Sequence, residues 1–362
     1  MSPLTLRGSG TSSTSSGSRR YSSRVKLCVG AGLFAVVFLW FITPTSGKLY
    51  KPSDHANPIA SENKDQEIVN SIVIPSYNEG PNMAPLVSRI FRAIPSEQVR
   101  HTEILVIDDN SQDNTASEIE ILREQGYNVH LHVRTKERGL SSAVLHGFTL
   151  AQGQKLLVMD ADLQHPPESV PAFLDALEEQ PNTPPHKIPK FALGTRYAKG
   201  YEMDKDWPFY RRVISWGARV LSRPLTNAQD PMGGFFALRK DLFMASQPLN
   251  PSGFKIGLEL LLKTPLLSTQ LVHVPYGFAK RQVGSSKLGM KVIIKYIGQL
   301  LALYQWRFGL FFYIFVFAVV SGGVYAIIHA LDYTVRKLHL EENTLGRAVL
   351  VKRQKRRHKS DV

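Results

Sequence analysis

The sequence predicts an α/β fold with a Rossmann-like, mostly parallel sheet and membrane-associated helices at both ends of the chain. Two observations predict the sheet: short β-branched and aliphatic runs alternate with helical stretches, and most of these runs are apolar at consecutive positions. Two apolar stretches, one toward each end, predict the membrane-associated helices. Of the 362 residues, 43% are hydrophobic and 20% charged, which excludes a wholly disordered chain.

The N-terminal part begins with residues 1–26, whose Ser, Thr, Gly and Arg content predicts a disordered basic tail. Residues 27–42 are uncharged and as a helix would span about 24 Å, which is short for a bilayer. Three interpretations compete: a short apolar membrane segment over 27–43, a cleaved signal peptide, or part of an organelle-targeting segment. Residues 44–70, which contain three prolines, are expected to form a linker.

From residue 71 the apolar runs and amphipathic stretches alternate. Strands are predicted over 71–75, 103–108, 128–133, 155–160 and 190–196, and helices near 82–94, 114–125, 139–151 and 168–180. Ligands of such sheets bind at the carboxyl ends of the strands. The polar residues that follow the strands therefore form the candidate site.

Asp160, Ala161 and Asp162 end the strand predicted over 155–160. Two carboxylates at this spacing can converge on one ion, with Gln164 as a neutral third ligand. Oxygen ligands of this kind suit Mg²⁺ or Mn²⁺ rather than zinc, and such ions usually share phosphate oxygens of a substrate. Two Asp residues at a strand end also commonly form a turn or a helix cap, so the spacing alone leaves both interpretations open.

The first two strands end in polar residues that are expected to be neighbours. Tyr77 follows the first strand and Asp109 the second, so an aromatic ring and a carboxylate could hold a base, by stacking and by accepting from a ring N–H. In the alternative interpretation, Pro75 merely ends a strand, and Asp109, Asn110 and Ser111 merely start the next helix.

Residues 287–307 predict an amphipathic helix, in which Lys287, Lys291, Lys295 and Gln299 form one polar stripe. The helix could be a surface helix packed on the domain. A helix lying in a membrane interface is favoured, because residues 308–331 follow with no formal charge and predict a transmembrane helix. A long buried core helix over 308–331 is the alternative.

The net charge of +14 is concentrated at the two ends. Residues 1–26 carry five basic residues and no acid, residues 333–362 carry nine against three, and a net charge of +3 remains between them. The basic tail over 332–362 therefore favours anionic lipid over nucleic acid as its partner. Cys28 is the sole cysteine, which excludes an intramolecular disulfide and a cysteine-based zinc site.

Six motifs together carry a resemblance to a known family. They are VIPSYNE (73–79), EILVIDDNSQDNT (103–115), RGLSSA (138–143), MDADLQHPPE (159–168), GTRY (194–197) and RQVGSSKLG (281–289). Over roughly residues 70–290 the chain resembles the family 2 glycosyltransferases of GT-A fold. The last three motifs narrow the resemblance to polyprenyl-phosphate transferases such as the dolichol-phosphate mannose synthases. A glycosyltransferase domain is therefore expected over 71–286.

The resemblance implies a role for individual residues. The positions that match nucleoside-binding residues of the donor, GDP-mannose, are Pro75, Tyr77, Glu79, Ile107 and Asp109. The donor and metal segment is matched by Asp160, Ala161 and Asp162, with Gln164 as a further metal ligand. Basic residues at the phosphates are matched by Arg196, Arg281 and Lys287, and Arg211 matches an arginine for the acceptor phosphate, although Arg212 beside it leaves that match uncertain by one position. Of these, the catalytic role is expected for Asp162, Arg196 and Arg211, and no role is assigned to Ser285 or to the loop 198–206.

The implied reaction is metal-dependent, inverting transfer of mannose from GDP-mannose to dolichyl phosphate, for protein glycosylation and GPI-anchor synthesis. A phosphate monoester has its second pKa near 6, so the acceptor needs no general base. Two alternatives remain: a polyprenyl-phosphate glucosyltransferase that uses UDP-glucose, and a non-catalytic, membrane-anchored sugar-nucleotide binder. The expected partners are the two substrates, the membrane and small membrane subunits, without nucleic acid.

The expected location is the endoplasmic reticulum membrane with the catalytic domain facing the cytosol. If both apolar stretches span, the basic residues at both ends would instead place that domain in the lumen. The conflict disappears if residues 27–42 are cleaved, interfacial or re-entrant.

Overall fold

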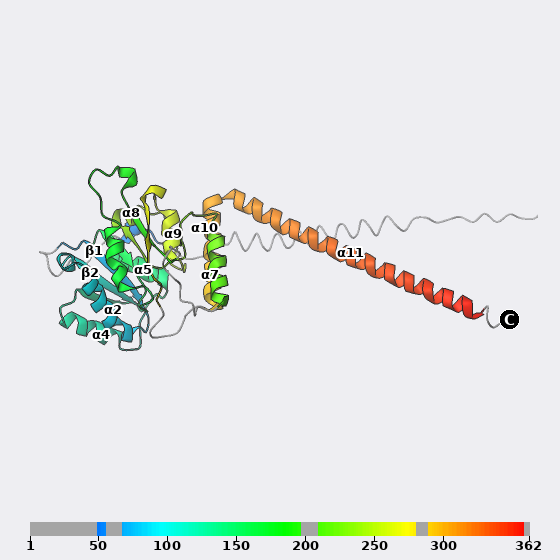
Figure 1. Ribbon diagram of the computed structural model, residues 1–362, viewed down its shortest axis with the longest axis horizontal. Coiled ribbons are helices and arrows are strands. Elements are labelled where there is room, and N and C mark those ends of the chain that lie inside the picture. The colour runs from blue at the N-terminus through cyan, green and yellow to red at the C-terminus, as the bar shows by residue number, and fades with distance from the viewer. Residues whose placement is uncertain (1–48, 56–66, 197–208, 280–288, 358–362) are drawn as a thin grey trace, which may run out of the picture. The chain divides into compact units, whose positions relative to one another are not determined.

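The computed structural model of the chain describes residues 49–55, 67–196, 209–279 and 289–357 (Figure 1). The chain divides into two compact units. The larger, residues 47–307, contains the sheet and the helices that cover it. The smaller combines residues 1–46 with residues 308–362, and its described part is one long helix. The predicted tail over 1–26 and the apolar segment over 27–43 lie outside the described residues.

Seven strands form one mixed sheet in the order β3-β2-β1-β4-β6-β5-β7. Their bounds are β1 Asn70–Ser76, β2 Thr102–Asp108, β3 Val129–Val133, β4 Lys155–Val158, β5 Phe191–Thr195, β6 Phe236–Arg239 and β7 Leu271–Pro275. All neighbours pair in parallel except at β6, which is antiparallel to both β4 and β5. The predicted α/β, mostly parallel fold is confirmed, and the five predicted strands are all present.

Helices cover both faces of the sheet (Figure 1). Their bounds are α2 Gly80–Ala93, α3 Ser96–Val99, α4 Thr115–Glu124, α5 Leu140–Leu150, α6 Val170–Asp175, α7 Phe209–Ser222, α8 Lys240–Met244, α9 Ile256–Lys263, α10 Met290–Phe308 and α11 Leu310–Arg357, with 3₁₀ turns at Pro52–His55, Pro167–Ser169, Pro185–Lys187 and Ser268–Gln270. Helices α2, α4 and α6 pack on one face, and α5, α8 and α9 on the other. Along β1, Ile72 and Ile74 point to the first face and Val73 to the second, which explains why the strand is apolar at every position.

One predicted helix is shorter than expected, and two strands of the sheet were not predicted. The helix predicted over 168–180 is the shorter α6, because Leu177 is the last buried residue and residues 178–180 are exposed, so no apolar face continues. Strands β6 and β7 were not predicted. β6 has four residues and passes directly into α8, so its apolar run carries no strand signature of its own.

A glycine sets the distance between α5 and β1. A Cβ atom at Gly147 would lie 2.4 Å from Cγ1 of Val73, far inside van der Waals contact. The absence of a side chain therefore lets α5 sit directly on the central strand. This close approach places the loop before α5 against the carboxyl ends of β1 and β2.

Helix α10 belongs to the larger unit and packs on α7. The hydroxyls of Tyr296 and Tyr304 donate to Ala218 O at 2.9 Å and to Leu221 O at 2.7 Å. The predicted polar stripe is wrong at Gln299, which is 4% exposed and faces the domain. The outward side of α10 instead carries the exposed Ile294 and Lys295, because the side chain of Gln299 is needed to pair backbone groups inside the domain.

The described part of the smaller unit is α11, a single helix of 48 residues. Its portion Leu310–Leu338 is 29 residues long, and its most apolar 18-residue window has a mean hydropathy of 2.3. By length and composition it is able to cross a membrane. Gly309, with φ of 52°, separates α11 from α10, and this left-handed conformation is one that glycine adopts without strain.

Candidate active site

The polar residues after β1, β2 and β4 meet at one edge of the sheet. The register pairs Ser76 with Asp108, and Val73 with Val158, so the three carboxyl ends are adjacent. Asp109 N donates to Ser76 O at 2.9 Å just beyond the ladder. The carboxyl ends of the first two strands are therefore neighbours, as expected.

After β2, the side chains of Asp108 and Asp113 accept hydrogen bonds from backbone N–H groups of nearby turns and helix starts, and the side chain of Asp109 has other partners. Asp108 Oδ2 accepts from Ser111 N at 2.7 Å, and Asp113 accepts from Thr115 N at 3.1 Å and from Gly80 N at 2.9 Å. Asp113 thereby joins the starts of α2 and α4. Asp108 and Asp113 therefore stabilise the turn and the helix starts here, whereas the side chain of Asp109 contacts other groups.

The carboxylate of Asp109 forms a buried ion pair with Arg134. Arg134 Nε donates to Oδ1 at 2.9 Å, Nη2 donates to the same oxygen, and Gly139 N donates to Oδ2 at 2.7 Å. Gly139 has φ of 137°, which only glycine adopts readily. Arg138, one residue earlier, lies over the half-exposed ring of Tyr77 at 5.4 Å. Arg134 directly follows β3 and was not among the predicted site residues.

The DADLQH loop after β4 is held by a neutral histidine. Asp160 N donates to Nδ1 of His165 at 3.0 Å, and the imidazole stacks on Phe235 with ring centroids 4.9 Å apart. Burial lowers the pKa of His165 to about 3, so the ring is uncharged at neutral pH. Gln164 N donates to Asp162 Oδ1 at 3.1 Å, which closes the loop on itself. His165 thus orients the loop as a packing residue.

The donor set of this loop fits a hard divalent cation. Asp160 has a 41% exposed side chain, Asp162 is largely buried beside it, and Gln164 adds an amide oxygen. A Cβ atom at Gly234 would lie 3.7 Å from both carboxylate oxygens of Asp160, so the glycine keeps the space beside them clear. In the described ranges no three His, Cys, Asp or Glu residues cluster as ligands, so a cation here would draw further oxygens from a substrate.

Arg196, at the end of β5, is held by a carboxylate that the sequence analysis missed. Nε and Nη2 of Arg196 donate to the two oxygens of Asp230 at 2.7 and 2.9 Å, and Asp230 is fully buried. This bidentate contact fixes the plane of the guanidinium. The cluster of polar residues and glycines in QDPMGGF, directly before an apolar run, is the signal that could have identified Asp230.

Lys255 is a second missed residue on the same side. Its Nζ donates to Met232 O at 2.9 Å, in the loop between Asp230 and Gly234. Burial, and then the nearby charge of Arg196, lowers the pKa of Lys255. A single lysine in SGFKIGL gives no sequence signal for such a position.

The remaining predicted residues fall into two groups. Pro75 pairs with Ile107 in the ladder, Ala161 is buried, and Glu79 Oε2 accepts from Asn82 Nδ2 at 2.9 Å at the start of α2. Arg211 lies in α7, but its side chain is not described. Arg281, Lys287, Ser285 and the loop 198–206 lie outside the described residues.

Comparison with known proteins connects this site to a family. The family described as Glycosyl transferase family 2 matches residues 71–246. A dolichol-phosphate mannosyltransferase of Mycosarcoma maydis is 49% identical over 253 residues, which cover 69% of this chain and 83% of that protein. This chain is a family 2 glycosyltransferase. A second dolichol-phosphate mannosyltransferase, from Saccharomyces cerevisiae, is 50% identical to this glycosyltransferase and covers 66% of it and 88% of its own length.

A solved structure is also similar to the glycosyltransferase. Glucosyl-3-phosphoglycerate synthase from Mycobacterium tuberculosis, in complex with Mn²⁺, UDP-glucose and phosphoglyceric acid, aligns with a TM-score of 0.47 and 17% identity, covering 66% of this chain and 79% of that one. The sequence-based resemblance to the dolichol-phosphate mannose synthases is confirmed by the two fungal relatives. The GT-A class expected with it agrees with the seven-stranded sheet.

Proposed function

We propose that this glycosyltransferase transfers mannose from GDP-mannose to dolichyl phosphate, with inversion at the sugar carbon and with the help of a divalent cation. The two fungal relatives named dolichol-phosphate mannosyltransferase support mannose transfer to dolichyl phosphate. The observation in the structure that carries it is the juxtaposition of the Asp160–Asp162 loop with the Arg196–Asp230 pair, through Gly234 and the loop that contains both Asp230 and Gly234. One edge of the sheet thus offers carboxylate ligands for a cation and a fixed guanidinium for a phosphate.

The donor half of the site is assigned to the ends of β1, β2 and β4. Tyr77 offers a half-exposed ring for stacking on the base, and Asp109 is the acceptor for a ring N–H. When bound, the cation would neutralise charge on the leaving nucleoside diphosphate, held by Asp160, Asp162 and Gln164. Arg281 and Lys287 are proposed to bind the same diphosphate.

The acceptor half is assigned to Arg196 and Arg211. A phosphate monoester is largely a dianion at neutral pH, so the nucleophile needs alignment rather than deprotonation. Asp230 fixes the guanidinium of Arg196, which favours one orientation of a bound phosphate. Attack on the face of the sugar opposite the leaving group would convert an α-linked donor into a β-linked lipid product, dolichyl β-D-mannosyl phosphate. No general base is assigned.

Activity with separate labelled donors tests this function. The purified full-length chain should form a labelled lipid from dolichyl phosphate and GDP-mannose, and none from UDP-glucose. Product from UDP-glucose alone would identify the glucosyltransferase alternative instead, and no product from either would favour the non-catalytic binder. Asp162→Ala should abolish the product, and Asp175→Ala, on the exposed side of α6, is the control that should keep it.

The proposed setting is the endoplasmic reticulum membrane, with α10 in the interface, Leu310–Leu338 spanning and the sheet domain facing the cytosol. The exposed Ile294 beside Lys295 on the outward side of α10 supports contact with a lipid surface. Protease added to sealed microsomes should digest the domain, because it faces the outside of such vesicles. Protection of residues 71–280 would contradict this orientation. Small membrane subunits are proposed as further partners, testable by co-purification in mild detergent.

A further inference from the structure

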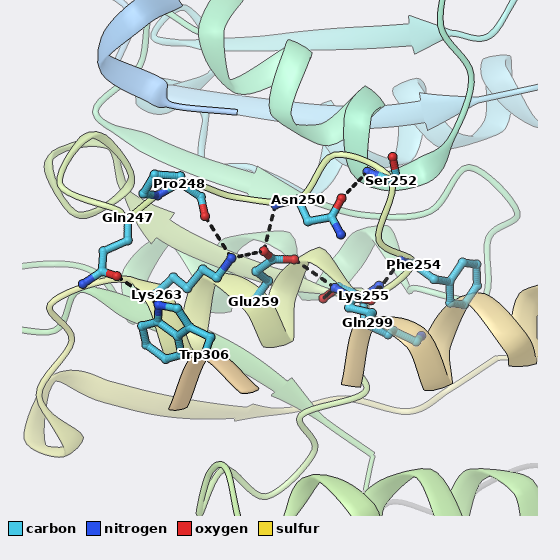
Figure 2. Close-up of polar contacts among 10 residues, drawn as sticks. All are labelled: Gln247, Pro248, Asn250, Ser252, Phe254, Lys255, Glu259, Lys263, Gln299 and Trp306. Atoms are coloured by element: carbon cyan, nitrogen blue, oxygen red, sulfur yellow. Dashed lines mark hydrogen bonds and ion pairs between the residues drawn. The ribbon is translucent and has the colours of Figure 1, made fainter. Parts of the chain in front are cut away.

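The buried side chain of Gln299 connects α10 to the turn that precedes α9 (Figure 2). Its Oε1 accepts from the backbone N–H groups of Phe254 and Lys255, both at 2.9 Å. Its Nε2 donates to Lys255 O at 3.2 Å. A Cβ atom at Gly253 would lie 2.6 Å from Nε2, so the turn has a glycine where the amide passes. One side chain of α10 thereby holds both the N–H and the C=O of Lys255.

A buried acidic residue fixes the orientation of this amide. Glu259, on α9, is 1% exposed, and its Oε2 accepts from Gln299 Nε2 at 3.1 Å. Its other oxygen accepts from Asn250 N at 2.8 Å and pairs with Lys263 Nζ at 2.6 Å (Figure 2). Because the carboxylate only accepts, the amide nitrogen must face it and the oxygen must face the turn. The Gln299 amide therefore binds the turn in a single orientation.

The turn held by Gln299 directs Lys255 into the site. The residue is the N-cap of α9, and its Nζ reaches Met232 O in the loop that supplies Asp230 to Arg196. The same loop places Gly234 beside the carboxylate of Asp160. The ammonium thus lies against the loop whose Asp230 binds Arg196 and whose Gly234 lies beside Asp160.

The hydrogen bonds of this ammonium are incomplete. Within the described part of the chain, Met232 O is its one hydrogen-bond acceptor, and the ring of Phe254 lies 5.0 Å from Nζ. An ammonium has three donors, so two remain for oxygens from outside the protein. The ammonium is partly withdrawn from water, and the charges of Arg196, Asp160 and Asp230 all act on it. Its two unused donors fit the oxygens of an anionic ligand.

We propose that Lys255 is a further catalytic residue that binds a phosphate oxygen of the substrates, and that Gln299 is the positioning residue that holds it there from α10. This inference rests on the proposed function. The phosphate has two sources, the diphosphate of the sugar nucleotide and the monophosphate of the lipid acceptor. In either case a phosphate oxygen would accept a hydrogen bond from Lys255 Nζ. The KM measurements below distinguish the two sources.

The first test removes the charge and keeps the length of the side chain. Lys255→Met in the full-length chain should lower kcat/KM roughly 10- to 100-fold, the value expected for one lost hydrogen bond between charged groups. A higher KM for GDP-mannose, with weaker binding of GDP measured by calorimetry, assigns the donor diphosphate. A higher KM for dolichyl phosphate, with unchanged GDP binding, assigns the acceptor.

A matched control is available in Lys240. Its ammonium is also half-buried and also donates to a backbone oxygen, Ala151 O at 2.7 Å, and burial likewise lowers its pKa. It lies at the start of α8, beside Asp241 and Met244 in a cavity. Because Arg239 pairs with Lys155, this cavity is next to the amino end of β4 and not at the carboxyl ends that form the candidate site. Lys240→Met should keep kcat and both KM values, even if its melting temperature falls.

The second test asks whether Gln299 acts through Lys255. Gln299→Leu should lower kcat/KM in the wild-type background and cause little further loss in Lys255→Met, because the ammonium it positions is already gone. An equal loss in both backgrounds would overturn the positioning role. Full kcat/KM in a folded Lys255→Met variant would overturn the inference as a whole, whereas no mannose transfer by the wild-type chain would overturn the proposed function instead.

Discussion

The two halves of the sheet build their parts of the site in different ways. On the β1–β4 side, the candidate residues directly follow strands, and each strand is joined to the next through a helix on one or the other face. On the β5–β7 side, the important contacts join separate elements: Arg196 to Asp230 across 34 residues and Gln299 to Lys255 across 44. The first half follows the rule for parallel sheets, and the second depends on buried polar contacts between residues that lie far apart in the sequence.

The largest effect is expected from breaking the contact between Arg196 and Asp230. Asp230→Asn keeps the shape and removes the charge that faces a guanidinium with a 10% exposed side chain. Removing one partner of a buried pair costs about 3–5 kcal/mol of stability, and turnover should fall with it because the guanidinium loses its fixed plane. Thermal unfolding and kcat measure the two effects. Unchanged turnover would show that the second half of the sheet does not need this contact.

A smaller and more selective effect is expected from Arg134→Met on the β1–β4 side. Asp109 loses its ion pair but keeps the hydrogen bond from Gly139 N. The KM for GDP-mannose should rise several-fold while the KM for dolichyl phosphate stays constant. Arg123→Met, which removes an exposed ion pair with Glu120, is the control that should change neither. A rise in the acceptor KM alone would reverse the assignment of the two halves.

Gly147→Ala should lower the stability of the domain. The new methyl group would meet Val73 on the central strand, and overpacking of this kind costs about 1–3 kcal/mol. Gly217→Ala in α7 is the matched control, since nothing lies within 4 Å of its Cβ position. That control should be neutral or stabilising, because alanine favours a helix over glycine. Equal melting temperatures for both variants would mean that α5 can move away from β1.

The smallest effect concerns His132 on the edge strand β3. Burial, and then the charges of His130 and His146, lower the pKa of His132 from its ordinary value of 6.5. The unfolded chain therefore binds this proton more readily, and stability should fall as the pH drops below about 6.5. His132→Gln should flatten that part of the pH dependence of the melting temperature. The same slope in the variant would assign the acid sensitivity to another group.

The sequence could predict those parts of the molecule whose structure or role follows from neighbouring residues in the chain. The five strands were readable because each is a short run rich in aliphatic residues between helical stretches, and Asp160 and Asp162 were readable because they follow a strand. Asp230, Lys255 and Gln299 were not, because their roles depend on partners that only the fold brings near. Gln299 even fitted a polar stripe by its spacing, since helical periodicity does not tell which side of a helix the domain covers.

Transfer of labelled mannose to dolichyl phosphate by the purified full-length chain tests the central claim most directly, when it is measured before and after removal of divalent cations. The labelled lipid should disappear with a chelator, return with Mg²⁺ or Mn²⁺, and be absent for Asp162→Ala under every condition. A labelled lipid that forms equally well in chelator, or with Asp162→Ala, would contradict the proposed cation site. No labelled lipid under any condition would contradict the proposed reaction itself.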